Sequence, residues 1–197
     1  MMYSHFQRMN DSERKKSFVK VFEHSIFIPV TTINAKEFTT RKSSDPYHPV
    51  DIAEQIAAKI TDYFNAHTSL KIPKGFDNWL GELVENSYDA FAKRGLTIGH
   101  SLLFKIVIKK SDSNLIVSIK DNAGGFCDKV PGQHFGIEDI QSEGKEEHYF
   151  IGGVGIGLTN LNTYLLKHNI QLFFKNRGKE NGTTVSMFFN PTSLTPS

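Results

Sequence analysis

Three polar residues, Glu82, Asn86 and Asp89, stand at the spacing i, i+4 and i+7. With 3.6 residues per helical turn, this spacing predicts one helix face that carries a carboxylate, an amide oxygen and a second carboxylate. Apolar or small residues occupy the other side of the same segment: Leu80, Leu83, Val84, Ser87, Ala90 and Phe91. Oxygen ligands of this kind suit Mg²⁺, and a carboxylate can act as a general base. A simple solvated helix face is the alternative interpretation, and Glu85 is expected to point away from the row into solvent.

Two glycine-bearing stretches follow this helix pattern. A strand-like run ends at Asp121 and continues into Asn122-Ala123-Gly124-Gly125, where the backbone can turn closely against a ligand. A simple turn capped by Asp121 is the alternative. Residues 152–158 read Gly-Gly-Val-Gly-Ile-Gly-Leu and lead directly into a helical pattern. Backbone N–H groups at such a helix start can face a phosphate.

Taken together and in this order, these stretches resemble the N box and glycine boxes of the GHKL superfamily. This is the Bergerat-fold ATPase superfamily of gyrase, heat-shock chaperones, histidine kinases and MutL. A further stretch, Asn181-Gly182-Thr183-Thr184, resembles its final Gly-Thr box. The resemblance covers most of residues 76–189 and implies an ATP-binding domain that uses Mg²⁺.

For the adenine end, the resemblance implies that Asp121 accepts a hydrogen bond from the adenine amino group. Gly125 would let the base approach the backbone, and Thr183 would support the same site. Asp89 would serve the adenine end or a neighbouring water network. Ala123 departs from the pattern, because many members have glycine at this place, and this puts the geometry of the turn in doubt.

For the phosphate end, the resemblance implies that Asn86 binds Mg²⁺ and that Glu82 is a general base. Glu82 would orient a water molecule or a substrate hydroxyl. The residues expected to hold the phosphates and the adjoining part of the nucleotide are Gly153, Gly155, Gly157 and Leu158.

In its layout the chain most resembles the stand-alone members of this superfamily, in which the ATP-binding domain is nearly the whole protein, such as the anti-sigma-factor serine kinases. Two classes of function stay open. One is an enzyme, either a kinase that phosphorylates a partner protein or a slow ATPase, and Glu82 favours it. The other is a nucleotide-gated protein-binding module without turnover, which the absence of a recognisable substrate-docking motif leaves open.

Composition limits the classes of partner. The 197 residues carry a formal net charge of +2 with 39% hydrophobic and 22% charged residues, which does not indicate nucleic-acid binding. Cys127 is the single cysteine, and no apolar run approaches a membrane span, so a cytoplasmic protein is expected. The sequence does not identify the partner protein, and it leaves a homodimer open.

The elements that must position these residues follow from hydrophobic periodicity. Strands are predicted over 24–30, 104–109, 115–119, 170–175 and 183–189; helices are predicted from 51 to about 64, over 76–93 and over 158–167; a loop is predicted over 36–49. The expected fold is an α+β two-layer sandwich, a mostly antiparallel sheet covered on one face by three helices. We expect an N-terminal arm at 1–20, one domain at 21–190 with a lid at about 127–150, and a tail at 191–197.

Overall fold

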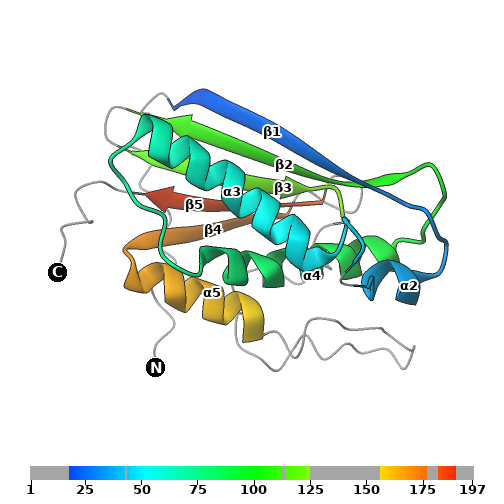
Figure 1. The fold of residues 1–197 in the computed structure, drawn as a ribbon. Helices are drawn as coiled ribbons and strands as arrows, with labels where there is room; N and C mark the ends of the chain where they lie inside the picture. Colours follow the sequence, from blue (N-terminus) through cyan, green and yellow to red (C-terminus); the bar gives the residue numbers. More distant parts are fainter. Residues whose placement is uncertain (1–17, 43, 112–113, 125–155, 177–181, 190–197) are drawn as a thin grey trace.

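The computed structural model describes residues 18–42, 44–111, 114–124, 156–176 and 182–189. Figure 1 shows their arrangement, which combines five strands with four helices in the described part of the chain. In chain order the elements are β1 (Val19–Pro29), α2 (Ala35–Thr39), α3 (Pro49–His67), α4 (Phe76–Lys93), β2 (Ser101–Lys110), β3 (Leu115–Asp121), α5 (Ile156–Lys167), β4 (Ile170–Asn176) and β5 (Thr183–Phe189).

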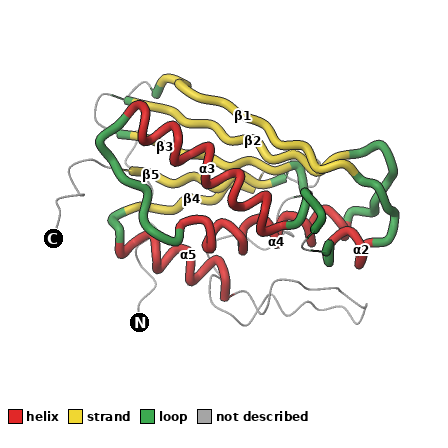
Figure 2. The backbone as a smooth tube through the Cα atoms, in the orientation of Figure 1, coloured by secondary structure: helices red, strands yellow, loops and turns green. Residues whose placement is uncertain are grey.

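The strands form one sheet in the order β1-β2-β3-β5-β4, and every neighbouring pair is antiparallel. Helices α3, α4 and α5 lie on the same face of this sheet, as the tube view shows (Figure 2). The predicted α+β sandwich is therefore confirmed. Because β5 pairs with β3, the last described strand lies beside the strand that ends at Asp121.

Helix α4 has the predicted bounds, Phe76 to Lys93. Its residues Leu80, Val84 and Tyr88 follow one another at four-residue spacing and are fully buried in the core, where Tyr88 stacks on Phe104 of β2. Side chains at this spacing lie on one face of a helix, so burying this face sets the rotation of α4 about its axis.

Helix α3 packs beside α4 and follows the same rule. Its buried stripe contains the residues whose four-residue spacing predicted the helix, namely Ile52, Ile56, Ile60 and Phe64. The helix begins at Pro49, two residues before the predicted start, and Pro is well suited to a first helical position.

The predicted loop over residues 36–49 is wrong in part, because α2 occupies Ala35–Thr39. The side chain of Asn34 caps this helix by accepting a hydrogen bond from the Glu37 N–H at 3.3 Å. Phe38 is buried and stacks on Tyr88 of α4, with ring centroids 5.2 Å apart. A helix this short is too brief to show a periodic pattern, and its burial against α4 stabilises it.

Several other boundaries differ from prediction by a few residues; for example, β2 begins at Ser101 rather than at 104, and α3 ends at His67 rather than at about 64. Strand β1 begins at Val19 rather than His24, and its early residues pair with the end of β2. Helix α5 begins at Ile156, two residues before the predicted start at Leu158. In the part of the chain that the structure describes, no helix is long and apolar enough to span a membrane.

Tyr88 also joins α4 to the loop before α3, because its hydroxyl donates a hydrogen bond to the Tyr47 carbonyl at 2.7 Å. We expect Tyr88→Phe to lower the free energy of unfolding by about 1–2 kcal/mol, since it leaves this carbonyl without its donor. Urea unfolding followed by circular dichroism measures the change.

The control for Tyr88→Phe is Tyr164→Phe, because the Tyr164 hydroxyl donates to the Lys74 carbonyl at 2.9 Å in an exposed setting. Water replaces an exposed partner at little cost, so this variant should lose clearly less stability. Equal losses in the two variants would contradict the role assigned to burial at Tyr88.

Candidate functional site

The three polar residues of the N-box pattern lie on α4 as predicted. The three side chains differ in their exposure to solvent. Asn86 is exposed, Glu82 is half-buried, and Asp89 is buried. The exposed amide of Asn86 is therefore accessible to an incoming ligand, whereas Asp89 belongs to the interior.

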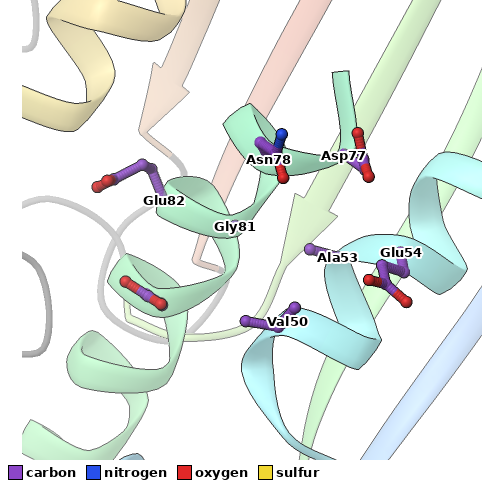
Figure 3. Close-up of a pocket in the computed structure, with 8 residues that line it drawn as sticks. Val50, Ala53, Glu54, Asp77, Asn78, Gly81 and Glu82 are labelled. Atoms are coloured by element: carbon purple, nitrogen blue, oxygen red, sulfur yellow. The ribbon is translucent and has the colours of Figure 1, made fainter. Parts of the chain in front are cut away.

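A pocket of about 150 Å³ lies between α3 and α4 (Figure 3). Its lining contains the four acids Glu54, Asp77, Glu82 and Glu85, with Val50, Ala53, Asn78 and Gly81. None of these described lining residues is a lysine or an arginine, so their charge opposes the entry of a phosphate. Asn86 and Asp89 are not among its lining residues, and Figure 3 shows Glu82 directed away from α3. An anionic ligand is therefore disfavoured in this pocket.

Glu85 does not point freely into solvent as expected. It is half-buried and lines the pocket between α3 and α4. Burial raises the pKa of its carboxyl group, and the neighbouring carboxylates of Glu82 and Asp89 raise it further. The helix therefore concentrates negative charge along this segment, and a bound cation would relieve it.

Asp121 is the most constrained acid of the candidate site. It ends β3 with 7% of its surface exposed, and its Oδ1 accepts hydrogen bonds from the Ala123 N–H at 2.8 Å and the Thr183 N–H at 3.1 Å. The bond to Ala123 closes a tight Asx turn, so alanine at this place is compatible with the turn. The bond to Thr183 brings Asp121 and Thr183 together across β3 and β5, and both residues are buried.

Gly182 is a further residue of this site, and its role was not predicted. It has a φ of 70°, a conformation that favours glycine, and it lies directly against Asp121. A Cβ atom at this position would overlap both the backbone oxygen and Oδ1 of Asp121. Glycine before Thr183 therefore allows the close approach that lets the Thr183 N–H reach the carboxylate.

Asn122 holds the turn from the other side. Its Oδ1 accepts a hydrogen bond from the Leu103 N–H at 2.8 Å, and its Nδ2 donates to the Ser101 carbonyl at 3.1 Å. Asp121 and Phe104 form the last residue pair between β3 and β2. Beyond this pair the main chain turns away, and the side chain of Asn122 makes the hydrogen bonds to β2 instead. The only sequence signal for this role is an asparagine directly after a predicted strand.

Arg94 connects this turn to α4. It follows the last residue of α4, and its guanidinium group donates a hydrogen bond to the Asn122 carbonyl. The end of the helix that carries Glu82, Asn86 and Asp89 is therefore tied to the turn that carries Asp121. Sequence reasoning did not identify this link, because Arg94 and Asn122 are far apart in the chain and belong to no shared pattern.

The predicted phosphate-binding glycines are described only in part. Gly157 and Leu158 fall in the first turn of α5. Gly125, Gly153 and Gly155 lie outside the described residues, as does the predicted lid. Among the described residues, no group of three or more His, Cys, Asp or Glu side chains is arranged to hold a metal ion.

Comparison with protein-family models and with curated proteins finds no match for this chain.

The close approach of Gly182 to Asp121 is tested by Gly182→Ala. We expect a loss of more than about 2 kcal/mol in the free energy of unfolding, since the variant combines an unfavourable φ with steric overlap. Chemical denaturation of the full chain gives this value.

Gly81→Ala is the matched control, because Gly81 lies within α4 and a Cβ there would meet nothing within 4 Å. Alanine favours a helix interior over glycine, so this variant should gain about 0.5–1 kcal/mol. If both substitutions shift stability in the same direction, the proposed contact between Gly182 and Asp121 is wrong.

Proposed function

We propose that this chain is a magnesium-dependent ATP-binding domain of the GHKL type that transfers the γ-phosphoryl group to a partner protein or to water. The observation that carries the proposal is the buried carboxylate of Asp121, oriented by the backbone N–H groups of Ala123 and Thr183. An ionised carboxylate only accepts hydrogen bonds, so it suits the amino group of adenine. Its fixed orientation reduces the entropy lost when the base binds.

The fold supports the same proposal. An antiparallel sheet with α3, α4 and α5 on one face is the architecture that the resemblance implies. Within it, the N-box pattern forms one helix, α4, and the Gly-Thr pattern leads into β5 beside Asp121. The motifs, which are distant in sequence, are thus compatible with one binding site.

Asn86 and Glu82 are the residues that we assign to the phosphate end. Asn86 is exposed on α4, and its amide oxygen is a hard ligand that Mg²⁺ accepts together with water and phosphate oxygens. The ion would offset the negative charge of the phosphates and of the α4 acids. Gly157 and Leu158 open α5, whose N-terminal N–H groups suit an anion.

Glu82 lies one turn before Asn86, and we assign it the role of general base. Its carboxylate would accept the proton of the attacking oxygen, which is a hydroxyl of the partner protein in a kinase or a water molecule in an ATPase. The attacking oxygen then bonds to the γ-phosphorus as ADP leaves. We also propose a cytoplasmic location, because the single Cys127 suits a reducing compartment.

Asp121→Asn tests the adenine site. The amide replaces a charged acceptor, so affinity for both ATP and ADP should fall about ten- to a hundredfold, as expected for losing a charge-assisted hydrogen bond. Isothermal titration calorimetry with Mg²⁺ measures both nucleotides.

The control is Asp77→Asn, which removes the same charge from the first turn of α4, on the pocket between α3 and α4. This variant should bind nucleotide like the wild type. Unchanged affinity in Asp121→Asn would remove Asp121 from the nucleotide site, and no binding to the wild type would reject the proposed function altogether.

Glu82→Gln separates catalysis from binding. We expect it to bind ATP like the wild type and to lose phosphoryl transfer about 10²- to 10⁴-fold, since a general base acts in the transition state. Asn86→Ala should weaken the magnesium-dependent part of binding as well as the rate. Phosphate release and transfer of radiolabel from ATP to lysate proteins measure the reaction.

The matched control for Glu82→Gln is Glu85→Gln, which removes a carboxylate from the flank of α4 that faces α3. Its rate should stay close to that of the wild type. If the wild type binds ATP but neither hydrolyses it nor labels a protein, the enzymatic role is wrong, and the domain is a nucleotide-gated binding module.

A further inference from the structure

Strand β1 forms one border of the sheet (Figure 1). It runs for 11 residues and pairs with β2 along one edge. Within the described ranges, no strand pairs with its other edge. Such an edge presents a row of backbone N–H and C=O groups that can pair with another strand, and natural proteins usually protect edges of this length.

Three large apolar side chains on β1 are exposed. The exposed fractions are 62% for Val19, 43% for Val21 and 61% for Phe27. They lie on a strand whose outer edge no described strand covers, so the border of the sheet combines apolar side chains with hydrogen-bonding groups. This combination is typical of a surface that another strand covers.

The pattern of β1 is close to symmetric about His24. In an antiparallel pair of identical strands related by a two-fold axis at His24, residues at equal distances on either side face each other. Counted along the strands, the exposed Val21 of one copy then comes opposite the exposed Phe27 of the second copy, at the irregular step of β1 that bounds the regular pairing on each side. Glu23 of one copy faces Ser25 of the other.

The face of β1 that packs toward the helices follows the same symmetry. Phe22 and Ile26, which are both partly buried and packed against the core, would face each other across the pair. Phe22 already contacts Tyr63 of α3, with ring centroids 5.5 Å apart, so the pairing would extend this cluster. The irregular step in β1 falls at Val21, which the register with β2 skips between Lys20 and Phe22, so the regular pairing between the two copies is limited to the five central positions 22–26.

Charge selects this register over its neighbours. A two-fold axis at Glu23 would place two glutamates opposite each other, and like charges there are unfavourable. An axis at Ser25 would place Glu23 against the apolar ring of Phe27. With the axis at His24, Glu23 keeps its ion pairs with Lys20 at 2.8 Å and Lys105 at 3.2 Å and faces a hydroxyl group.

We propose that β1 is a homodimer interface, in which two copies of this chain pair their β1 strands antiparallel about an axis at His24. The two five-stranded sheets join into one continuous sheet, and the interface is isologous because the same surface of each copy faces the other. The occupant of the edge is a second copy of the chain. This assembly is independent of nucleotide and goes beyond the function proposed above.

The oligomeric state of the full chain provides the first test. Sedimentation velocity over a range of micromolar concentrations should show a dimer for the wild type. Phe27→Glu should weaken the dimer by roughly tenfold or more, because it buries a charge against Val21 of the second copy. The matched control is Ile98→Glu, since Ile98 is 66% exposed but lies outside β1, and it should leave the dimer intact.

A monomeric wild type would overturn the proposal, as would equal weakening by Phe27→Glu and Ile98→Glu. The second test fixes the register. In a Cys127→Ser background, His24→Cys places two cysteines opposite each other at the axis. Directly opposed residues have Cβ atoms about 4.5–5.5 Å apart, close to what a disulfide requires.

Mild oxidation should therefore link His24→Cys into a covalent dimer. The matched control is Ser25→Cys, whose two copies lie offset by two positions along the strands and should link much more slowly. Linking of Ser25→Cys at the same rate as His24→Cys, or no linking of either variant, would overturn the proposed strand pairing.

Discussion

The candidate site depends on keeping one carboxylate, that of Asp121, buried at the end of β3. A buried carboxylate is unfavourable unless hydrogen bonds replace the water that it loses. Two backbone N–H groups, from Ala123 and Thr183, do so at Oδ1. The second of these comes from the neighbouring strand β5, and it reaches the carboxylate because Gly182 has no side chain. The buried position of Asp121 therefore depends on the pairing of β3 with β5.

The same turn is connected to the helix layer. The side chain of Asn122 accepts a hydrogen bond from the Leu103 N–H of β2, where a backbone carbonyl would otherwise do so. The side chain of Arg94, at the end of α4, donates a hydrogen bond to the Asn122 carbonyl. At the middle of the helix, Tyr88 joins α4 to the loop that precedes α3. These contacts hold α4 in one position and one rotation relative to Asp121. A row of polar side chains on α4 can then act together with a group on the sheet.

The sheet also separates two surfaces with different chemistry. The row on α4 is polar, and the Asp121 turn lies on a central strand. The outer edge of β1, which no described strand covers, combines exposed apolar side chains with backbone groups. The β1 edge is two strands away from β3, so pairing there would leave the α4 and Asp121 region of each copy uncovered. The proposed nucleotide binding and the proposed assembly would thus use different parts of one small fold.

Local patterns in the sequence determined the elements and the candidate residues, whereas the tertiary structure decided how those residues are held. The four-residue spacing in α3 and the alternation in the hairpin predicted these elements because burial on one face has a fixed period. Helix α2 was missed because five residues show no period, and Glu85 is half-buried because α3 packs beside it. The roles of Gly182, Asn122 and Arg94 depend on neighbours distant in the chain. Such contacts leave no local period in the sequence, since strand order and helix packing alone bring them together.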